Sequence, residues 1–306
     1  MRVGLAGSRA SADLKVLKRE IEDLGHNAVI FNPRKFPQYA TGSLGAGGDE
    51  ICARTRGHIS PSRCAVATYD HLSLLDLDSL YIGDLEGRDA FFRGYFDRDI
   101  WAALRERYLE FASSEVDISA FQMSFLLAAA ERLPTVNRPE AIMTTRLRPY
   151  ALWKIARQGI AVWPFEIRRA SGRRVREAED RCYDVPCFQR GLKHTLSLVG
   201  EAPARVWRAV VAAGAHPATR KMIVDQGGHL TGAPAPTEVG DIAYRLLGIF
   251  GLAVAEIELV PAEGKISVLG ISAFPHLAEF EEVTGERVGA LVAQVLTGSG
   301  GRDRQD

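Results

Sequence analysis

The stretch that most constrains the fold lies near the end of the chain, at residues 241–296. Apolar residues first recur there at helical spacing and then meet Gly251, at a position where helices commonly stop. The segment that follows alternates apolar side chains with Glu256 and Glu258, which is the period of a half-buried strand. A turn leads to a second strand at 266–271, and a loop leads back to helical spacing. The pattern therefore predicts helix, strand, turn, strand, loop and helix, in that order.

Two runs of residues in this half of the chain form a recognisable pattern. The later run consists of Gly251-Leu252, Val254-Ala255, Glu258, Val268-Leu269, Pro275 and Glu281-x-x-Thr284-Gly285. The earlier run consists of Asn137-x-Pro139-x-Ala141-Ile142, Arg148, Gly159-Ile160-x-Val162 and Pro164. Both resemble the RimK-like glutamate ligase branch of the ATP-grasp ligases. Members of that branch carry N-x-P-x-A-I … K … G-I-x-V-P and then G-L-x-V-A-G-V-D … V-L-E-V-N-x-x-P-G … E-x-x-T-G.

The resemblance implies an α/β fold with α+β character in the C-terminal half. It places a parallel-sheet pre-ATP-grasp domain at 1–134 and a shortened ATP-grasp-like domain at 135–297. The start of the chain agrees with this, because a short strand, an amphipathic helix ending at Gly25 and a second strand form a βαβ-like opening. We expect the polar, Gly-rich residues 298–306 to be a disordered tail.

The chain departs from the family at the positions that hold nucleotide and metal. The Glu-x-Asn pair that binds magnesium at the ATP phosphates reads Gly270 and Ser272 here, and neither residue offers the carboxylate that this hard cation prefers. The family's first phosphate-contacting lysine aligns with Arg148, and its acidic hinge residue near the adenine aligns with Arg190. The Gly-rich phosphate loop and the second lysine have no counterpart between residues 164 and 189.

Four residues remain as candidates for contact with a nucleotide. Glu258 keeps one acidic metal position, Arg148 replaces the phosphate lysine, and Arg220 matches a family arginine. His276 occupies a position where the family has glycine, and it suits either acid–base work or an ordinary packing role. One carboxylate is too little to hold magnesium on ATP, because phosphoryl transfer depends on neutralising oxygen charge. We therefore predict no catalytic residues, no metal ligands and no cofactor.

Charge and hydropathy exclude several other classes of function. Among the 306 residues, 38 are Lys or Arg and 38 are Asp or Glu, so no global field favours nucleic acid or anionic membrane. No apolar run is long enough to span a bilayer, and the N-terminus lacks a signal-peptide pattern, so we expect a cytoplasmic protein without membrane or nucleic-acid partners. The four cysteines have no metal-site spacing and fit a reducing compartment.

Two charged clusters leave alternatives open. Asp76, Asp78 and Asp84 fit either the solvated face of a strand or turn, or a metal site. The basic run at 168–176 fits either an exposed hairpin or loop, or a contact to an anion or acidic partner, because guanidinium forks suit phosphate and carboxylate.

The sequence supports two main hypotheses of function. The first is a degenerate ATP-grasp protein, a non-catalytic partner or binding subunit that pairs with an active relative, forms a homo-oligomer, or binds a small acid or peptide in the inherited cleft. The alternative is an active ligase that uses ATP and magnesium, with altered metal ligation, to convert a carboxylate to an acyl phosphate for attack by an amine. That alternative requires Arg148 and Glu258 to converge on one cleft. A third hypothesis is that only the α/β architecture is shared.

Overall fold

The computed structural model describes the chain in twelve segments, which are residues 1–32, 40–43, 45–47, 50–52, 66–69, 72–83, 126–169, 182–186, 194–199, 203–214, 220–262 and 264–298. The chain divides into two compact units, Met1–Pro139 and Glu140–Asp306. Several sequence predictions fall outside the described residues, namely those on Asp84, on Arg190, on 170–176 within the basic run and on 299–306 of the predicted tail.

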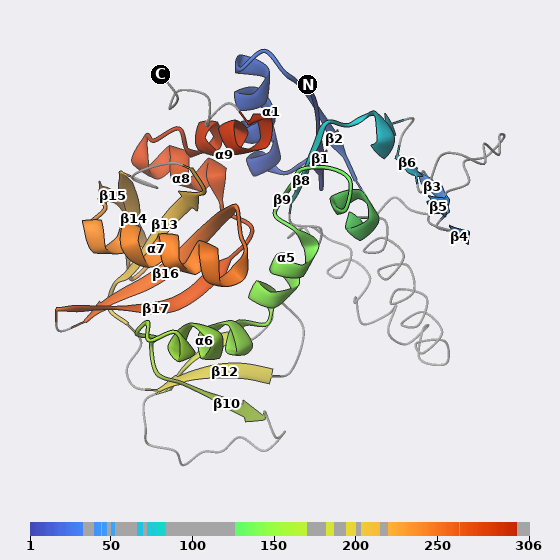
Figure 1. Ribbon diagram of the computed structural model, residues 1–306. Helices are drawn as coiled ribbons and strands as arrows, with labels where there is room; N and C mark the ends of the chain where they lie inside the picture. The colour runs from blue at the N-terminus through green and yellow to red at the C-terminus, as the bar shows by residue number, and fades with distance from the viewer. Residues whose placement is uncertain are drawn as a thin grey trace, which may run out of the picture. The chain divides into compact units, whose positions relative to one another are not determined.

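The first unit is built on a four-stranded parallel sheet (Figure 1). Its strand order is β2 (Asn27–Phe31), β1 (Arg2–Ala6), β8 (Ser79–Ile82) and β9 (Thr135–Val136). Helix α1 (Ala12–Asp23) joins β1 to β2. The Oγ of Ser11 accepts a hydrogen bond from the Leu14 amide at its N-terminus, and the helix buries Leu14, Leu17 and Ile21. The predicted βαβ-like opening is confirmed.

Along the chain, smaller elements follow β2 and precede β8. They are β3 (Ala40–Ser43), β4 (Gly45–Gly47), β5 (Glu50–Cys52), β6 (Val66–Tyr69), β7 (Leu72–Ser73) and the 3-10 turn η2 (Leu74–Asp76). The carboxylates of Asp76 and Asp78 are exposed and both contact Arg2, the first at 3.8 Å and the second through the Arg2 amide at 2.6 Å. For these two residues the structure favours the solvated-face alternative.

The second unit contains a five-stranded antiparallel sheet, shown in Figure 1 with helix α7 lying across it. The strand order is β15 (His229–Pro234), β14 (Lys221–Gln226), β13 (Val206–Ala212), β16 (Val254–Ala262) and β17 (Lys265–Ser272). The helices that follow β15 and β17 in the chain and pack on this sheet are α7 (Thr237–Phe250), α8 (Leu277–Thr284) and α9 (Val288–Thr297), and α6 (Arg148–Arg157) contacts its strand β17.

The sequence pattern explains most of this arrangement. Helix α7 ends at Gly251, which adopts a left-handed conformation with φ of 64° that glycine tolerates without strain. Strands β16 and β17 form the predicted hairpin. One helix was predicted after the loop, whereas the structure has two, because Gly285, with φ of 67°, ends α8 before α9 begins.

Two further helices and a small sheet precede the five-stranded sheet in the chain. The helices are α5 (Pro139–Arg146) and α6 (Arg148–Arg157), and the antiparallel sheet has the order β10 (Phe165–Arg169), β12 (His194–Val199) and β11 (Cys182–Pro186). After α6, the Trp163 amide donates to the Val268 carbonyl at 2.9 Å, which brings this segment alongside β17. Among the described residues, no helix combines the length and apolar character needed to cross a bilayer.

Candidate functional site

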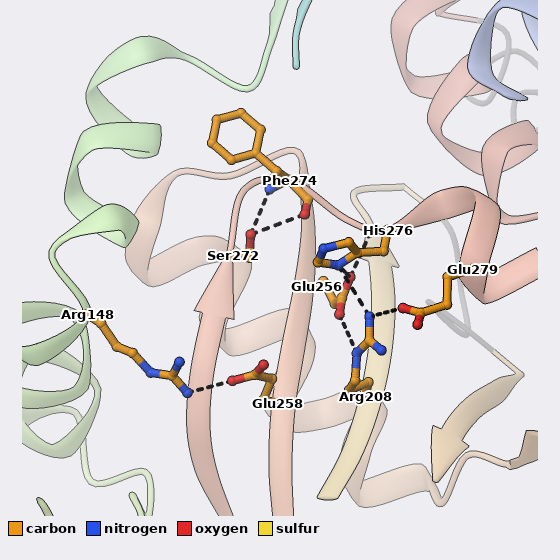
Figure 2. Close-up of polar contacts among 8 residues, drawn as sticks. All are labelled: Arg148, Arg208, Glu256, Glu258, Ser272, Phe274, His276 and Glu279. Atoms are coloured by element: carbon orange, nitrogen blue, oxygen red, sulfur yellow. Dashed lines mark hydrogen bonds and ion pairs between the residues drawn. The ribbon is translucent and has the colours of Figure 1, made fainter. Parts of the chain in front are cut away.

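One face of the five-stranded sheet carries polar residues from three neighbouring strands. Glu256 and Glu258 are two positions apart on β16, so both side chains point to the same face. Arg208 on β13 lies opposite Glu258, while Gly270 and Ser272 on β17 lie opposite Glu258 and Glu256. We refer to Arg208, Glu256, Glu258, Gly270 and Ser272 as the polar face; all but Gly270 are drawn in Figure 2.

An ion pair between Arg148 and Glu258 occupies the space above Gly270. The Nη2 of Arg148 lies 2.6 Å from the Oε2 of Glu258. A Cβ atom added at Gly270 would stand 2.7 Å from that oxygen and 2.8 Å from that nitrogen, closer than atoms pack. Glycine at this position therefore makes room for the ion pair.

A β-bulge contributes to the same contact. The register of the β16–β17 pairing shifts after Glu258, so that Gly270 pairs with Glu258 and Val268 with Leu259, and Leu269 is left over. The Leu269 carbonyl accepts hydrogen bonds from the Nη2 and Nε of Arg148, at 2.9 and 3.3 Å. The guanidinium is therefore held by both a carboxylate and a backbone oxygen.

A second cluster surrounds Glu256, whose side chain is only 4% exposed. Its Oε1 accepts from the Nε of Arg208 at 2.7 Å. Its Oε2 accepts from the backbone amide of His276 at 2.7 Å and lies 2.8 Å from His276 Nδ1. Burial alone would raise the pKa of this carboxyl, but the hydrogen bonds and charges of His276 and Arg208 outweigh it and lower the pKa to about 2. Glu256 is therefore an ionised, fully paired buried carboxylate.

Hydrogen-bond chemistry fixes the roles of the remaining atoms in this cluster. A carboxylate can only accept, so His276 Nδ1 carries the proton that it donates to Glu256. The 3.3 Å approach of Arg208 Nη2 to the same nitrogen is then a close contact between two donors. That Nη2 instead pairs with the Oε2 of Glu279 at 2.7 Å. Burial lowers the pKa of Arg208, but Glu256 and Glu279 together raise it above its usual value.

The family that the chain resembles binds magnesium at the positions of Gly270 and Ser272. The residues of the polar face do not fit a magnesium ion. Gly270 supplies no ligand, and Glu258 is already held by Arg148. The hydroxyl of Ser272 turns back on its own loop, accepting from the Phe274 amide at 3.1 Å and donating to the Phe274 carbonyl at 3.2 Å. Within the described residues, no group of three His, Cys, Asp or Glu side chains has the spacing of a metal site.

The four sequence-predicted residues are distributed over three places. Arg148 and Glu258 form one ion pair, and His276 contacts Glu256 on the same face (Figure 2). Arg220 is exposed and precedes β14, where its backbone amide donates to Glu286 at 3.2 Å.

Sequence reasoning missed the roles of Arg208, Glu256 and Glu279. The spacing of Glu256 and Glu258 already indicated two carboxylates on one face. The position of Arg208 opposite Glu258 follows from the pairing of β13 with β16, which are far apart in the sequence.

Comparison with known proteins gives a result at the level of fold. No family model and no curated protein sequence matches the chain. Among solved structures, ATP-grasp ligase PsnB, complexed with a variant of its minimal precursor, Mg and ADP, matches with a TM-score of 0.71 and 16% identity, over 97% of both chains. The macrocyclase MdnC from Microcystis aeruginosa MRC, bound with precursor peptide MdnA, matches with a TM-score of 0.68 and 12% identity, over 97% of this chain and all of the other. A RimK domain ATP-grasp protein from Sphaerobacter thermophilus matches with a TM-score of 0.53 and 16% identity, over 97% of this chain and all of the other.

The chain therefore has the ATP-grasp fold. The predicted resemblance to RimK-like ATP-grasp ligases and the predicted α/β class are confirmed at this level. With identities of 12–16% among these three structures, fold is what the similarity establishes.

Proposed function

We propose that this protein is an ATP-grasp-fold binding subunit that does not turn over ATP. It binds a peptide or a small acid, and it assembles with an active relative or with a second copy of itself. The observation that carries the proposal is the Arg148–Glu258 ion pair above Gly270. It sets a guanidinium where the family resemblance calls for the second magnesium-binding carboxylate. A metal ion would have to displace this cation and would then find a single carboxylate.

A peptide ligand is supported by the structures that the chain resembles. PsnB has been solved with precursor peptide PsnA2, and MdnC with precursor peptide MdnA. A chain that keeps such a fold and loses the metal ligands is suited to hold a peptide without modifying it.

A thermal-shift titration with ATP, ADP and AMPPNP, each with and without magnesium, tests the proposal. A ligand that binds the folded state raises its stability by about 2.7 kcal/mol at a hundredfold excess over its Kd. We expect no magnesium-dependent rise in Tm and no release of phosphate from ATP. A magnesium-dependent rise that disappears in Glu258→Ala would contradict the proposal.

An active carboxylate–amine ligase is the second candidate function. The observation that favours it is the contact between Arg148 and Glu258, because a working site with altered ligation needs these two side chains together. Phosphate release from ATP that requires both a carboxylate and an amine would establish this candidate in place of the first.

A further inference from the structure

A surface on helices α6 and α7 gathers exposed aromatic side chains and cations. We call it the α6–α7 surface and define it by Tyr150, Trp153, Lys154, Arg157, Gln158 and Arg245. Tyr150 and Trp153 are 48% and 50% exposed, and their rings stack with centroids 5.8 Å apart. Rings of this size held at the surface are typical of protein contact sites, where Tyr, Trp and Arg are enriched.

The cations of this surface are held by rings and backbone oxygens. The guanidinium of Arg157 lies 5.3 Å from the centroid of the Trp153 ring, and the ammonium of Lys154 lies 5.0 Å from that of Phe250. The Nη2 of Arg245 donates to the Gln158 carbonyl at 3.0 Å. In the part of the chain that the structure describes, Lys154, Arg157 and Arg245 have no carboxylate within ion-pairing distance. Three cations that form no ion pair among the described residues favour an anionic partner.

The two helices also line an open depression at this surface. It has a volume of about 390 Å³ and is lined by Lys154, Gln158, Arg245, Gly248 and Ile249. Gly248 is exposed, and a Cβ added there would meet no atom within 4 Å, so the missing side chain leaves this space open. The volume suits one or two side chains of a partner.

We propose that the α6–α7 surface is a docking site for an acidic peptide segment of a partner protein. One side chain of the segment enters the depression beside Gly248 and Ile249, and its carboxylates pair with Lys154, Arg157 and Arg245. A peptide fits better than nucleic acid, because the whole chain has a formal net charge of zero and supplies no extended positive field. The surface shares no residue with the polar face, so this proposal goes beyond the proposed function and holds whether or not the chain turns over ATP.

The test uses the full chain and a fluorescein-labelled peptide that alternates Asp and Glu with Leu and Phe. A matched peptide has Lys in place of every acid. We expect the acidic peptide to raise the fluorescence anisotropy saturably and the basic peptide to leave it unchanged. The double charge reversal Lys154→Glu with Arg245→Glu, and separately Trp153→Ala, should each weaken binding at least about tenfold.

Two further variants separate docking from general effects of charge and folding. Gly248→Leu fills the depression and replaces a poor helix former, so it should block binding while the fold is retained. Arg205→Glu changes an exposed cation on another part of the same unit and should leave binding unchanged.

Four results would overturn the proposal. The first is equal binding of the two peptides, or no binding of the acidic peptide at millimolar concentration. The second is that the Gly248→Leu variant and the charge-reversal variant both bind the acidic peptide as tightly as the wild type does. The third is a fall of several degrees in Tm for the charge reversal but not for Arg205→Glu, because the surface would then pack against the chain itself. The fourth is tighter, variant-sensitive binding of a single-stranded oligonucleotide.

Discussion

Gly270 makes the Arg148–Glu258 pair sterically possible. Its missing side chain leaves a gap directly opposite Glu258, and the guanidinium of Arg148 fills that gap from the start of α6. The atoms that a new Cβ would meet are the ends of two flexible side chains. At Gly232 on β15, by contrast, a Cβ would meet backbone atoms of Val283 and Thr284 at 3.0 and 3.1 Å.

The substitution Gly270→Ala should therefore lower the free energy of unfolding less than Gly232→Ala does. We expect Gly270→Ala to lower the free energy of unfolding by less than about 1 kcal/mol, because the two side chains can rotate away. We expect Gly232→Ala to lower it by about 1–3 kcal/mol, because backbone must move. Urea denaturation of both variants measures this difference. The reverse order would mean that the ion pair above Gly270 is rigidly fixed.

The ionised state of Glu256 predicts a pH dependence of stability. Its carboxyl pKa falls from 4.5 to about 2 on folding. A lowered folded-state pKa means that the stabilisation is fully present above about pH 4.5 and is lost as the pH falls toward 2. The total stabilisation from the lowered pKa of Glu256 is about 3 kcal/mol. Denaturation curves at several pH values should show this loss in the wild type and a flatter profile in Glu256→Gln.

An exposed acid on α8 provides the control for this experiment. The variant Glu282→Gln should keep the acid sensitivity of the wild type, since Glu282 is exposed and lies outside the buried cluster. If Glu256→Gln also keeps it, other carboxylates are responsible for the acid sensitivity.

At the scale of elements, Arg208 connects strand β13 to strand β16 and to helix α8. It pairs with Glu256 on β16 and with Glu279 in the first turn of α8. Glu256 in turn accepts the amide of His276, the residue at which α8 begins. One network centred on the buried Glu256 therefore fixes the start of α8 against the sheet.

Removing the cation from this network should be strongly destabilising. We expect Arg208→Met to lower the free energy of unfolding by about 3–5 kcal/mol, because Glu256 would remain buried with one positive partner fewer. The double variant Arg208→Met with Glu256→Gln should recover part of that loss, since no charged carboxylate then remains at the buried position 256; Glu279, which also loses Arg208, is 40% exposed. Chemical denaturation of the two single variants and the double variant measures the coupling.

The exposed residue Arg205, just before β13, provides the comparison for Arg208. Arg205→Met should change the free energy of unfolding by no more than about 0.5 kcal/mol. A loss for Arg208→Met as small as that for Arg205→Met would mean that water, and not Arg208, compensates the charge of Glu256.

The elements of this region were more predictable from sequence than its contacts. The alternation around Glu256 and the stop at Gly251 are local signals, and they predicted β16 and the end of α7. The contact of Arg208 with Glu256 depends on the register between strands far apart in sequence. The contact of Arg148 with Glu258 depends further on the bulge at Leu269, for which the sequence pattern has no local signal.

At the scale of the whole molecule, the chain shares the ATP-grasp fold with proteins of low sequence identity. Structures with 16% identity or less match nearly the full length of the chain. Such a fold depends on the apolar cores of its sheets and helices, which many sequences can supply. A metal site, by contrast, depends on a few oxygen atoms, so the loss of magnesium binding that we propose requires changes at very few positions, of which Gly270 and Ser272 are the ones that carry no carboxylate here.

Restoring the family's residues at Arg148, Gly270 and Ser272 should restore a response to magnesium. The triple variant Arg148→Lys, Gly270→Glu and Ser272→Asn places a second carboxylate opposite Glu258, with Cβ atoms about 4.5–5.5 Å apart. Like charges at that distance destabilise the sheet until a cation binds, and carboxylate and amide oxygens are ligands that magnesium accepts. We expect the triple variant to have a lower Tm than the wild type without metal and a larger rise in Tm on adding magnesium chloride. The same triple variant carrying Glu258→Gln should lose most of that rise. An equal rise in the wild type would mean that Arg148 releases Glu258 to the metal and that the site is still able to bind it.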